Sequence, residues 1–179
     1  MLYYTGIGSR ETPNEILILF ENIGYYLGQK CFILRSGHAI GADQAFENGA
    51  DKGNFPKEIY LPWSNFEGSD SSLIVNNPKA FEIAEEFHTY WHNLKDGAKK
   101  LQARNSHQVL GKDLNTPSNF VICWTKNGKD LGGTAQAIRI ARYYEIPIFN
   151  VGGYKDADEF KVELYRYLID NFNVKEGDK

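Results

Sequence analysis

Residues 31–52 read CFILRSGHAIGADQAFENGADK, and this stretch decides the fold. The apolar run 31–34 is typical of a buried strand, segment 36–43 carries two glycines, and 44–52 has the pattern of a helix. The chain opens on the same unit, because the apolar run 2–7 (LYYTGI) also stops at glycines and is followed by a helical pattern. Two such units in succession predict parallel strands joined by right-handed helical crossovers.

The rest of the chain continues this alternation. The unbroken apolar run 120–124, FVICW, predicts a central strand covered on both faces. Further strands are expected at 58–62 and 147–151, and helices at 79–94, about 98–110, 134–144 and 158–171. The sequence therefore predicts an α/β protein with a Rossmann-like, doubly wound parallel sheet, a single domain over residues 1–172 with a frayed tail at 173–179.

Local signals refine these elements. Thr12, Pro13 and Glu15 form a capping box with a proline start, which predicts the first turn of the first helix, and Gly28 is expected to end that helix. Residues 63–78 are polar and irregular, and their length predicts a lid or binding loop.

Composition narrows the class of protein. A chain of 179 residues that is 42% hydrophobic can build a sufficient core without a disulfide or a metal. Cys31 and Cys123 lie in apolar runs without metal-ligand spacing and are expected to be buried, reduced thiols. With no secretion signal and no membrane-spanning stretch, we expect a cytoplasmic protein without a membrane partner. A net charge of -3 favours small ligands over nucleic acid, which stays an alternative partner.

Three glycine-bearing segments, 6–10, 36–43 and 132–134, follow strand-like runs or lead into expected helices. Because the carboxyl ends of parallel strands meet at one edge of a sheet, these segments are expected to share a ligand site there. Glycine lets backbone amides approach an anion, and helix N-termini favour negative charge. The ligand-binding residues expected in these segments are Gly6, Gly8, Ser9, Arg10, Ser36, Gly37, His38, Gly41, Asp43, Gly132, Gly133 and Thr134.

Side chains in these segments suit a phosphate-bearing nucleotide. The Arg10 guanidinium is a forked donor that matches phosphate oxygens. Asp43 would accept a hydrogen bond from a ribose hydroxyl or brace its loop through backbone amides. His38 would contact an anion or a base, or fill an exposed loop. The expected partner is therefore a nucleotide or a nucleotide-derived small molecule.

The segments TGIGSR (5–10), LRSGHAIGADQAFENGA (34–50), ARNSHQVLG (103–111) and GGTAQAIRIA (132–141) resemble the SLOG superfamily. This superfamily includes the core of the DNA-processing protein A (DprA) recombination mediators and the Lonely Guy (LOG) phosphoribohydrolases. The resemblance spans residues 2–151 and implies a Rossmann-like, nucleotide-binding fold. It also implies that Arg104 and Asn105 line the site, with Arg104 closing on the anion, and that the chain forms a homodimer through the helices around 79–110.

Departures from the two families leave the activity open. LOG enzymes carry a catalytic glutamate where this chain has Ala137, and a methyl group neither accepts a proton nor stabilises an oxocarbenium ion. A LOG-like N-glycosidase would need Asp43 or an unidentified residue. For a DprA-like module that binds single-stranded DNA, Ile40 and Ser106 stand where arginines are usual. A basic strip of Lys99, Lys100, Arg104 and Lys112 would serve that function, with a solvated helix face as the alternative.

A metal site has weak support in the sequence. His88 and His92 are four residues apart on an expected helix, and Glu85 precedes His88 by three residues. This spacing is compatible with a zinc site, but no further ligand is nearby. We expect no metal and no cofactor. The leading hypothesis is a nucleotide-binding protein, whose small size would suit a phage or mobile element.

Overall fold

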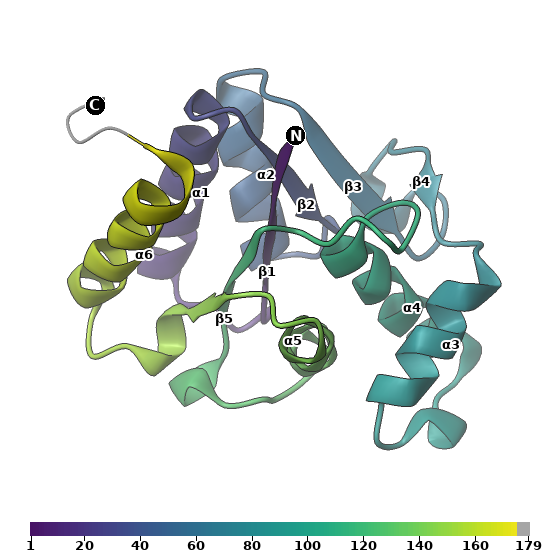
Figure 1. Cartoon of the computed structure of the whole chain (residues 1–179). Coiled ribbons are helices and arrows are strands. Elements are labelled where there is room, and N and C mark those ends of the chain that lie inside the picture. Colours follow the sequence, from purple (N-terminus) through teal and green to yellow (C-terminus); the bar gives the residue numbers. More distant parts are fainter. Residues whose placement is uncertain (175–179) are drawn as a thin grey trace.

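The computed structural model describes residues 1–174 and contains a six-stranded, all-parallel sheet with helices on both faces (Figure 1). Along the sheet the strand order is β4-β3-β2-β1-β5-β6. The strands are β1 (Leu2–Gly8), β2 (Phe32–Ser36), β3 (Lys57–Leu61), β4 (Leu73–Ile74), β5 (Phe120–Trp124) and β6 (Ile148–Asn150). The Rossmann-like α/β fold expected from the sequence is confirmed. Residues 175–179 of the expected tail lie outside the described residues.

The helices form two layers that sandwich the sheet. They are α1 (Asn14–Gln29), α2 (Ala42–Lys52), α3 (Pro78–Phe87), α4 (Asp96–Leu110), α5 (Thr134–Tyr143) and α6 (Ala157–Phe172). Phe120 and Ile122 of β5 pack with α1, α2 and α6, whereas Val121 and Cys123 pack with α3, α4 and α5. Strand β5 is therefore buried on both faces, as its apolar run predicts. Within residues 1–174, no helix has both the length and the apolar content that crossing a bilayer requires.

The connection order creates a crevice between β1 and β5. From β1 the chain builds β2, β3 and β4 outward on one side, then returns to place β5 on the other side of β1. Gly8 at the end of β1 lies in register with Trp124 at the end of β5. Ligands of open parallel sheets bind outside the carboxyl ends of the strands where the order reverses, so the topology itself marks this edge.

The first helix begins later than its sequence signals predict. It starts at Asn14, Pro13 is its N-cap, and no side chain caps it. The Thr12 hydroxyl instead donates to the Ser9 carbonyl oxygen at 2.6 Å. The capping-box prediction is wrong because Thr12 closes the turn after β1 and its hydroxyl is therefore not available to the helix.

The end of α1 also differs from expectation. Gly28 lies inside the helix, where an added Cβ would be 2.2 Å from the Phe55 ring, so this glycine permits close packing and does not end the helix. Cys31 turns the chain in the left-handed region, with φ 63°, and is exposed. The expectation of two buried thiols therefore holds for Cys123 and fails for Cys31.

The region between β3 and α4 contains more turns than expected. A short strand, β4, pairs with β3 inside the segment predicted to be irregular. Helix α3 ends at Phe87 and not near residue 94, because His88 is extended and a 3-10 turn follows that buries Trp91. His88 and His92 are therefore not neighbours on one helix face. Among the described residues, no group of three or more His, Cys, Asp or Glu side chains could hold a metal ion.

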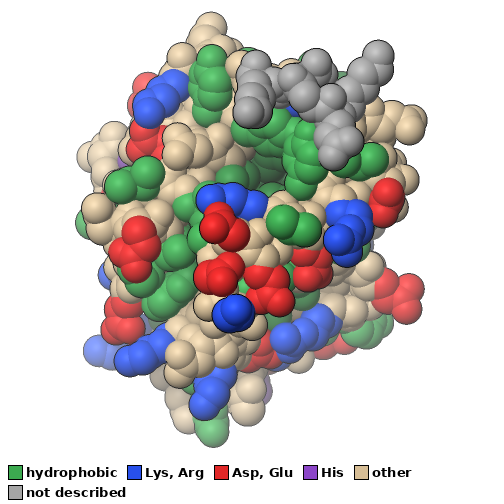
Figure 2. Space-filling view, turned by 90° about the vertical axis from the view of Figure 1, so that its left-hand side faces the viewer, with side chains coloured by type: hydrophobic (Ala, Val, Ile, Leu, Met, Phe, Trp, Pro, Cys, Tyr) green, Lys and Arg blue, Asp and Glu red, His purple; other side chains and the backbone are tan. Residues whose placement is uncertain are grey.

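The face formed by α6 and α1 mixes charges of both signs with apolar side chains (Figure 2). On α6 this surface contains Asp158, Glu159, Glu163 and Arg166. Nucleic acid requires a surface that is predominantly positive, so this face is unsuited to a phosphate backbone.

Candidate functional site

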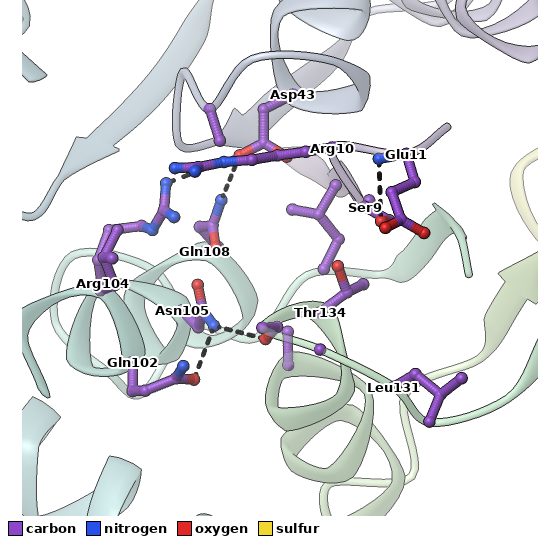
Figure 3. Close-up of a pocket in the computed structure, with 17 residues that line it drawn as sticks. Ser9, Arg10, Glu11, Asp43, Gln102, Arg104, Asn105, Gln108, Leu131 and Thr134 are labelled. Atoms are coloured by element: carbon purple, nitrogen blue, oxygen red, sulfur yellow. Dashed lines mark hydrogen bonds and ion pairs between the residues drawn. The ribbon is translucent and has the colours of Figure 1, made fainter. Parts of the chain in front are cut away.

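A cavity of about 370 Å³ opens at the carboxyl ends of β1 and β5. Its walls come from the segments that follow β1, β2 and β5 and from one face of α4 (Figure 3). A cavity of this volume is within the range of small-molecule sites. It is lined by Ile7, Gly8, Ser9, Arg10, Glu11, Ala39, Asp43, Leu101, Gln102, Arg104, Asn105, Gln108, Leu131, Gly132, Gly133, Thr134 and Ala137.

The structure brings most of the expected site residues to this cavity. Those that line it are Gly8, Ser9, Arg10, Asp43, Arg104, Asn105, Gly132, Gly133 and Thr134. Those that do not line it are Gly6, Ser36, Gly37, His38 and Gly41. Gly6 and Ser36 lie within β1 and β2, whereas Gly37, His38 and Gly41 lie in the loop between β2 and α2.

Gly6 and Ser36 join the two strands behind the cavity. The Ser36 hydroxyl donates to the Gly6 carbonyl oxygen at 2.6 Å, and an added Cβ at Gly6 would be 2.6 Å from the Phe46 ring. Gly41 takes φ 101° directly before α2, a conformation that favours glycine. These three residues position the loops around the cavity without lining it.

His38 is directed into an ion-pair network on α2. Its Nδ1 lies 2.6 Å from Glu47 Oε2, and the Lys57 ammonium lies 2.7 Å from the other carboxylate oxygen of Glu47. The His38 ring therefore faces Glu47 and does not line the cavity, where a ligand was expected to meet it. The backbone of His38 is in the left-handed region, with φ 57°, and this conformation directs the ring toward Glu47.

Asp43 is the buried centre of the site. Its carboxylate accepts hydrogen bonds from the backbone amides of Ala39 and Gly8 and from Gln108 Nε2 at 3.3 Å. Burial raises the pKa of Asp43, while the charge of Arg104, 3.6 Å away, and the hydrogen bonds oppose the rise. Of the two roles expected for Asp43, the geometry matches bracing, because this one side chain ties the β1 and β2 loops to α4.

Arg104 extends from α4 to the β2 loop and is only 6% exposed. Its Nη1 donates to the Gly37 carbonyl oxygen at 2.6 Å, and an added Cβ at Gly37 would be 1.6 Å from that nitrogen. Its Nε is buried and has no hydrogen-bond partner within residues 1–174. Burial lowers the pKa of Arg104, Asp43 opposes this, and the charge of Arg10 lowers the pKa further.

Arg10 adds a second guanidinium to the cavity. Figure 3 shows its side chain extending across the cavity toward Arg104. The Arg10 side chain is 63% exposed, in contrast to the buried Arg104. The cavity therefore contains one exposed guanidinium, Arg10, and one buried guanidinium, Arg104, which lies 3.6 Å from the Asp43 carboxylate. Guanidiniums suit an incoming anion as charged, forked donors.

The N-terminus of α5 forms the opposite wall. Gly132 takes φ 66°, and an added Cβ at Gly132 or Gly133 would meet no atom within 4 Å. Asn105 Nδ2 donates to the Gly133 carbonyl oxygen at 3.0 Å and fixes this loop to α4. The first turn of α5, from Thr134, thus presents the positive end of a helix dipole beside open space.

Sequence reasoning missed the amide side chains of α4. Gln102 and Gln108 line the cavity together with Leu101, one face of the helix on which Arg104 and Asn105 also lie. The helical spacing of these positions was the available signal, since residues three and four apart share one face of a helix.

Two further positions bear on the alternatives. Ala137 lines the cavity where the family resemblance places the LOG glutamate, so its methyl group occupies the wall that would carry that carboxylate. Arg104 faces the cavity and is buried, so it does not belong to a surface strip with Lys99 and Lys100. The expected basic strip of surface residues therefore does not include Arg104.

His107, on the same helix, gives a pH-dependent prediction. Its ring stacks on Tyr60 at 5.4 Å, and Nδ1 donates to the Gly111 carbonyl oxygen. Burial lowers the pKa of His107. In the unfolded chain this histidine binds a proton with a pKa of about 6.5, and in the folded protein it does so only at lower pH. The contribution of neutral His107 to stability is therefore present above about pH 6.5 and is lost as the pH falls through the lowered pKa.

We expect the free energy of unfolding to fall between about pH 7 and about pH 5, and His107→Phe, which keeps an aromatic ring against Tyr60, to reduce that fall. Urea unfolding of both proteins across this range measures the effect. An identical pH slope in the two proteins would contradict the prediction.

Neither a protein-family model nor a curated protein matches this sequence. Two solved structures of the molybdenum cofactor (Moco) carrier protein from Chlamydomonas reinhardtii align with it. One has 17% identity over 94% of this chain and 87% of that chain, with a TM-score of 0.53. The other has 15% identity over 94% and 88%, with a TM-score of 0.54. DNA processing protein A from Helicobacter pylori aligns at 20% identity over 93% of this chain and 72% of that chain, with a TM-score of 0.53. At these identities the likeness shows the fold.

Proposed function

We propose, on the premise that this chain has the fold of the SLOG superfamily, that its cavity binds the phosphate group of a nucleotide or a nucleotide-derived small molecule. The observation that carries the proposal is the presence of two guanidiniums, those of Arg10 and Arg104, in one cavity, with Arg104 held beside the buried carboxylate of Asp43. Each guanidinium is a forked donor that matches the oxygens of a phosphate, and the Arg10 side chain, 63% exposed, is accessible to one.

The remaining lining suits the rest of such a ligand. The α5 N-terminus at Gly133 and Thr134 offers backbone amides to a phosphate oxygen. Gln102 and Asn105 offer amide groups to sugar hydroxyls or to the edge of a base. Leu131, 54% exposed at the rim, supplies an apolar surface for a flat ring. Ligand sites commonly combine apolar walls with a few polar groups in this way.

The two kinds of structural neighbour suggest different ligands. One is named as a carrier of the molybdenum cofactor, and the other as a protein that binds single-stranded DNA. A small molecule is favoured for this chain, because Arg104 lies within a cavity and a DNA strand needs an open, basic groove. The homodimer expected through α3 and α4 stays a prediction, which light scattering of the protein in solution would test.

We propose binding without cleavage of an N-glycosidic bond. Ala137 leaves the LOG glutamate position without a carboxylate, and Asp43 already accepts hydrogen bonds from two backbone amides and Gln108. Incubation with AMP or GMP followed by chromatography should show no free base. Release of adenine or guanine would favour the N-glycosidase alternative.

The direct test is titration calorimetry with AMP, ADP, ATP and cyclic AMP, using Gly133→Ala as a steric probe. The substitution meets no protein atom and keeps a helical φ of -64°, so folding should be unchanged. If the ligand lies against the α5 N-terminus, the added methyl group should weaken binding by about tenfold or more.

Gly97→Ala is the matched control, because its added Cβ lies 3.8 Å from Trp63 and away from the cavity lining. Its affinity should equal that of the wild type. The proposal fails if none of the four nucleotides binds, or if binding is unchanged by both Gly133→Ala and Arg10→Ala.

A further inference from the structure

The turn between β3 and β4 contacts both arginines of the cavity. Phe66 is 4% exposed, and its ring centre lies 5.8 Å from the guanidinium carbon of Arg104. Trp63 packs edge-on against Phe66, with ring centres 5.3 Å apart, so the turn is anchored by aromatic contacts. The neighbouring side chain, Glu67, is directed to the other arginine.

The contact between Glu67 and Arg10 is weak and accessible. Glu67 Oε1 lies 3.7 Å from Arg10 Nη2, and the side chains are 29% and 63% exposed. Exposed ion pairs at such a distance contribute little, because solvent screens them and two long side chains must be held in place. The Arg10 guanidinium is therefore held near the cavity by a partner that is easily replaced.

We propose that Glu67 is an internal competitor for Arg10: its carboxylate pairs with the guanidinium when the cavity is empty and is displaced by the anionic group of the ligand. This inference rests on the proposed function. It makes Glu67 a residue that sets affinity without itself binding the ligand, and it gives the 63–68 turn a role in sensing occupancy.

A phosphate should displace the Glu67 carboxylate from the Arg10 guanidinium. A phosphate accepts two parallel hydrogen bonds from one guanidinium, and such charged pairs are shorter and stronger than the long contact with Glu67. Each binding event nevertheless loses the Arg10–Glu67 contact. Removal of the Glu67 charge should therefore tighten the binding of anions.

The experiment is calorimetric titration of AMP and of inorganic pyrophosphate into the wild type, Glu67→Gln, Arg10→Ala and the double variant. We expect Glu67→Gln to bind about two- to fivefold more tightly at low salt, a gain comparable to the loss of one exposed ion pair. The gain should shrink at high salt and be absent in the Arg10→Ala background. Asp70→Asn is the control, because it removes a charge three residues after Glu67 at a residue that has no ion pair among residues 1–174. This substitution should leave the affinity unchanged.

The outcomes separate this inference from the proposed function. Binding by the wild type with no gain in Glu67→Gln, or a gain that persists without Arg10 or appears equally in Asp70→Asn, overturns the role of Glu67 and leaves the function standing. If AMP and pyrophosphate bind to neither the wild type nor Glu67→Gln, while the nucleotide panel also fails, both are overturned.

Discussion

Asp43→Asn is expected to lower the free energy of unfolding by about 3–5 kcal/mol, the cost of leaving a buried charge without its partner. Arg104 would keep its positive charge at 6% exposure with no carboxylate beside it. The new amide would also point a donor at the backbone N–H groups of Gly8 or Ala39, which now donate to Asp43. Urea unfolding at neutral pH measures the loss.

A double-mutant cycle assigns this loss to the pair. Arg104→Met removes the guanidinium while keeping much of the side-chain volume, and the double variant removes both charges. Because the two groups interact, the double variant should be more stable than the sum of the two single losses predicts. A loss below about 1 kcal/mol for Asp43→Asn would show that Asp43 does not neutralise Arg104.

Gly37→Ala is expected to destabilise the protein by at least about 1–3 kcal/mol and to abolish nucleotide binding. Its Cβ would be 1.6 Å from Arg104 Nη1 and 2.6 Å from Gln108 Nε2, so both side chains must move. A displaced Arg104 loses its hydrogen bond to the Gly37 carbonyl oxygen. Thermal unfolding and calorimetric titration of AMP measure the two effects.

The stability control for Gly37→Ala is again Gly97→Ala, a helical glycine whose substitution should be neutral or slightly stabilising. If Gly37→Ala retains both wild-type stability and wild-type affinity, Arg104 cannot be fixed against the β2 loop in solution.

The sequence predicted the edge of the sheet at which the cavity lies, because glycines after apolar runs report where strands end. It also predicted nine of the cavity-lining residues from loop position and family resemblance. It could not separate the residues that line the cavity from those that build it. Gly37 and Gly8 are both glycines near the end of a strand and give the same signal in the sequence. In the structure Gly37 lies against the Arg104 guanidinium, whereas Gly8 lines the cavity.

The failures share a physical cause, which is competition between local and tertiary contacts. Thr12 has the pattern of a helix cap, but its hydroxyl donates to the Ser9 carbonyl oxygen. His38 lies in a loop suited to anions, but Glu47 on α2 attracts its ring. Glu67 gives no sequence signal at all, because its relation to Arg10 arises only when the β3–β4 turn folds against the β1 loop.

The lengths of the strands have a consequence for self-association. The sheet ends at β4, two residues long, and at β6, three residues long, whereas the interior strands have five or seven. An edge offers unpaired amides and carbonyls to a neighbouring molecule, and a short edge offers few. Fibre growth by edge-to-edge strand addition is therefore disfavoured at both margins of the sheet.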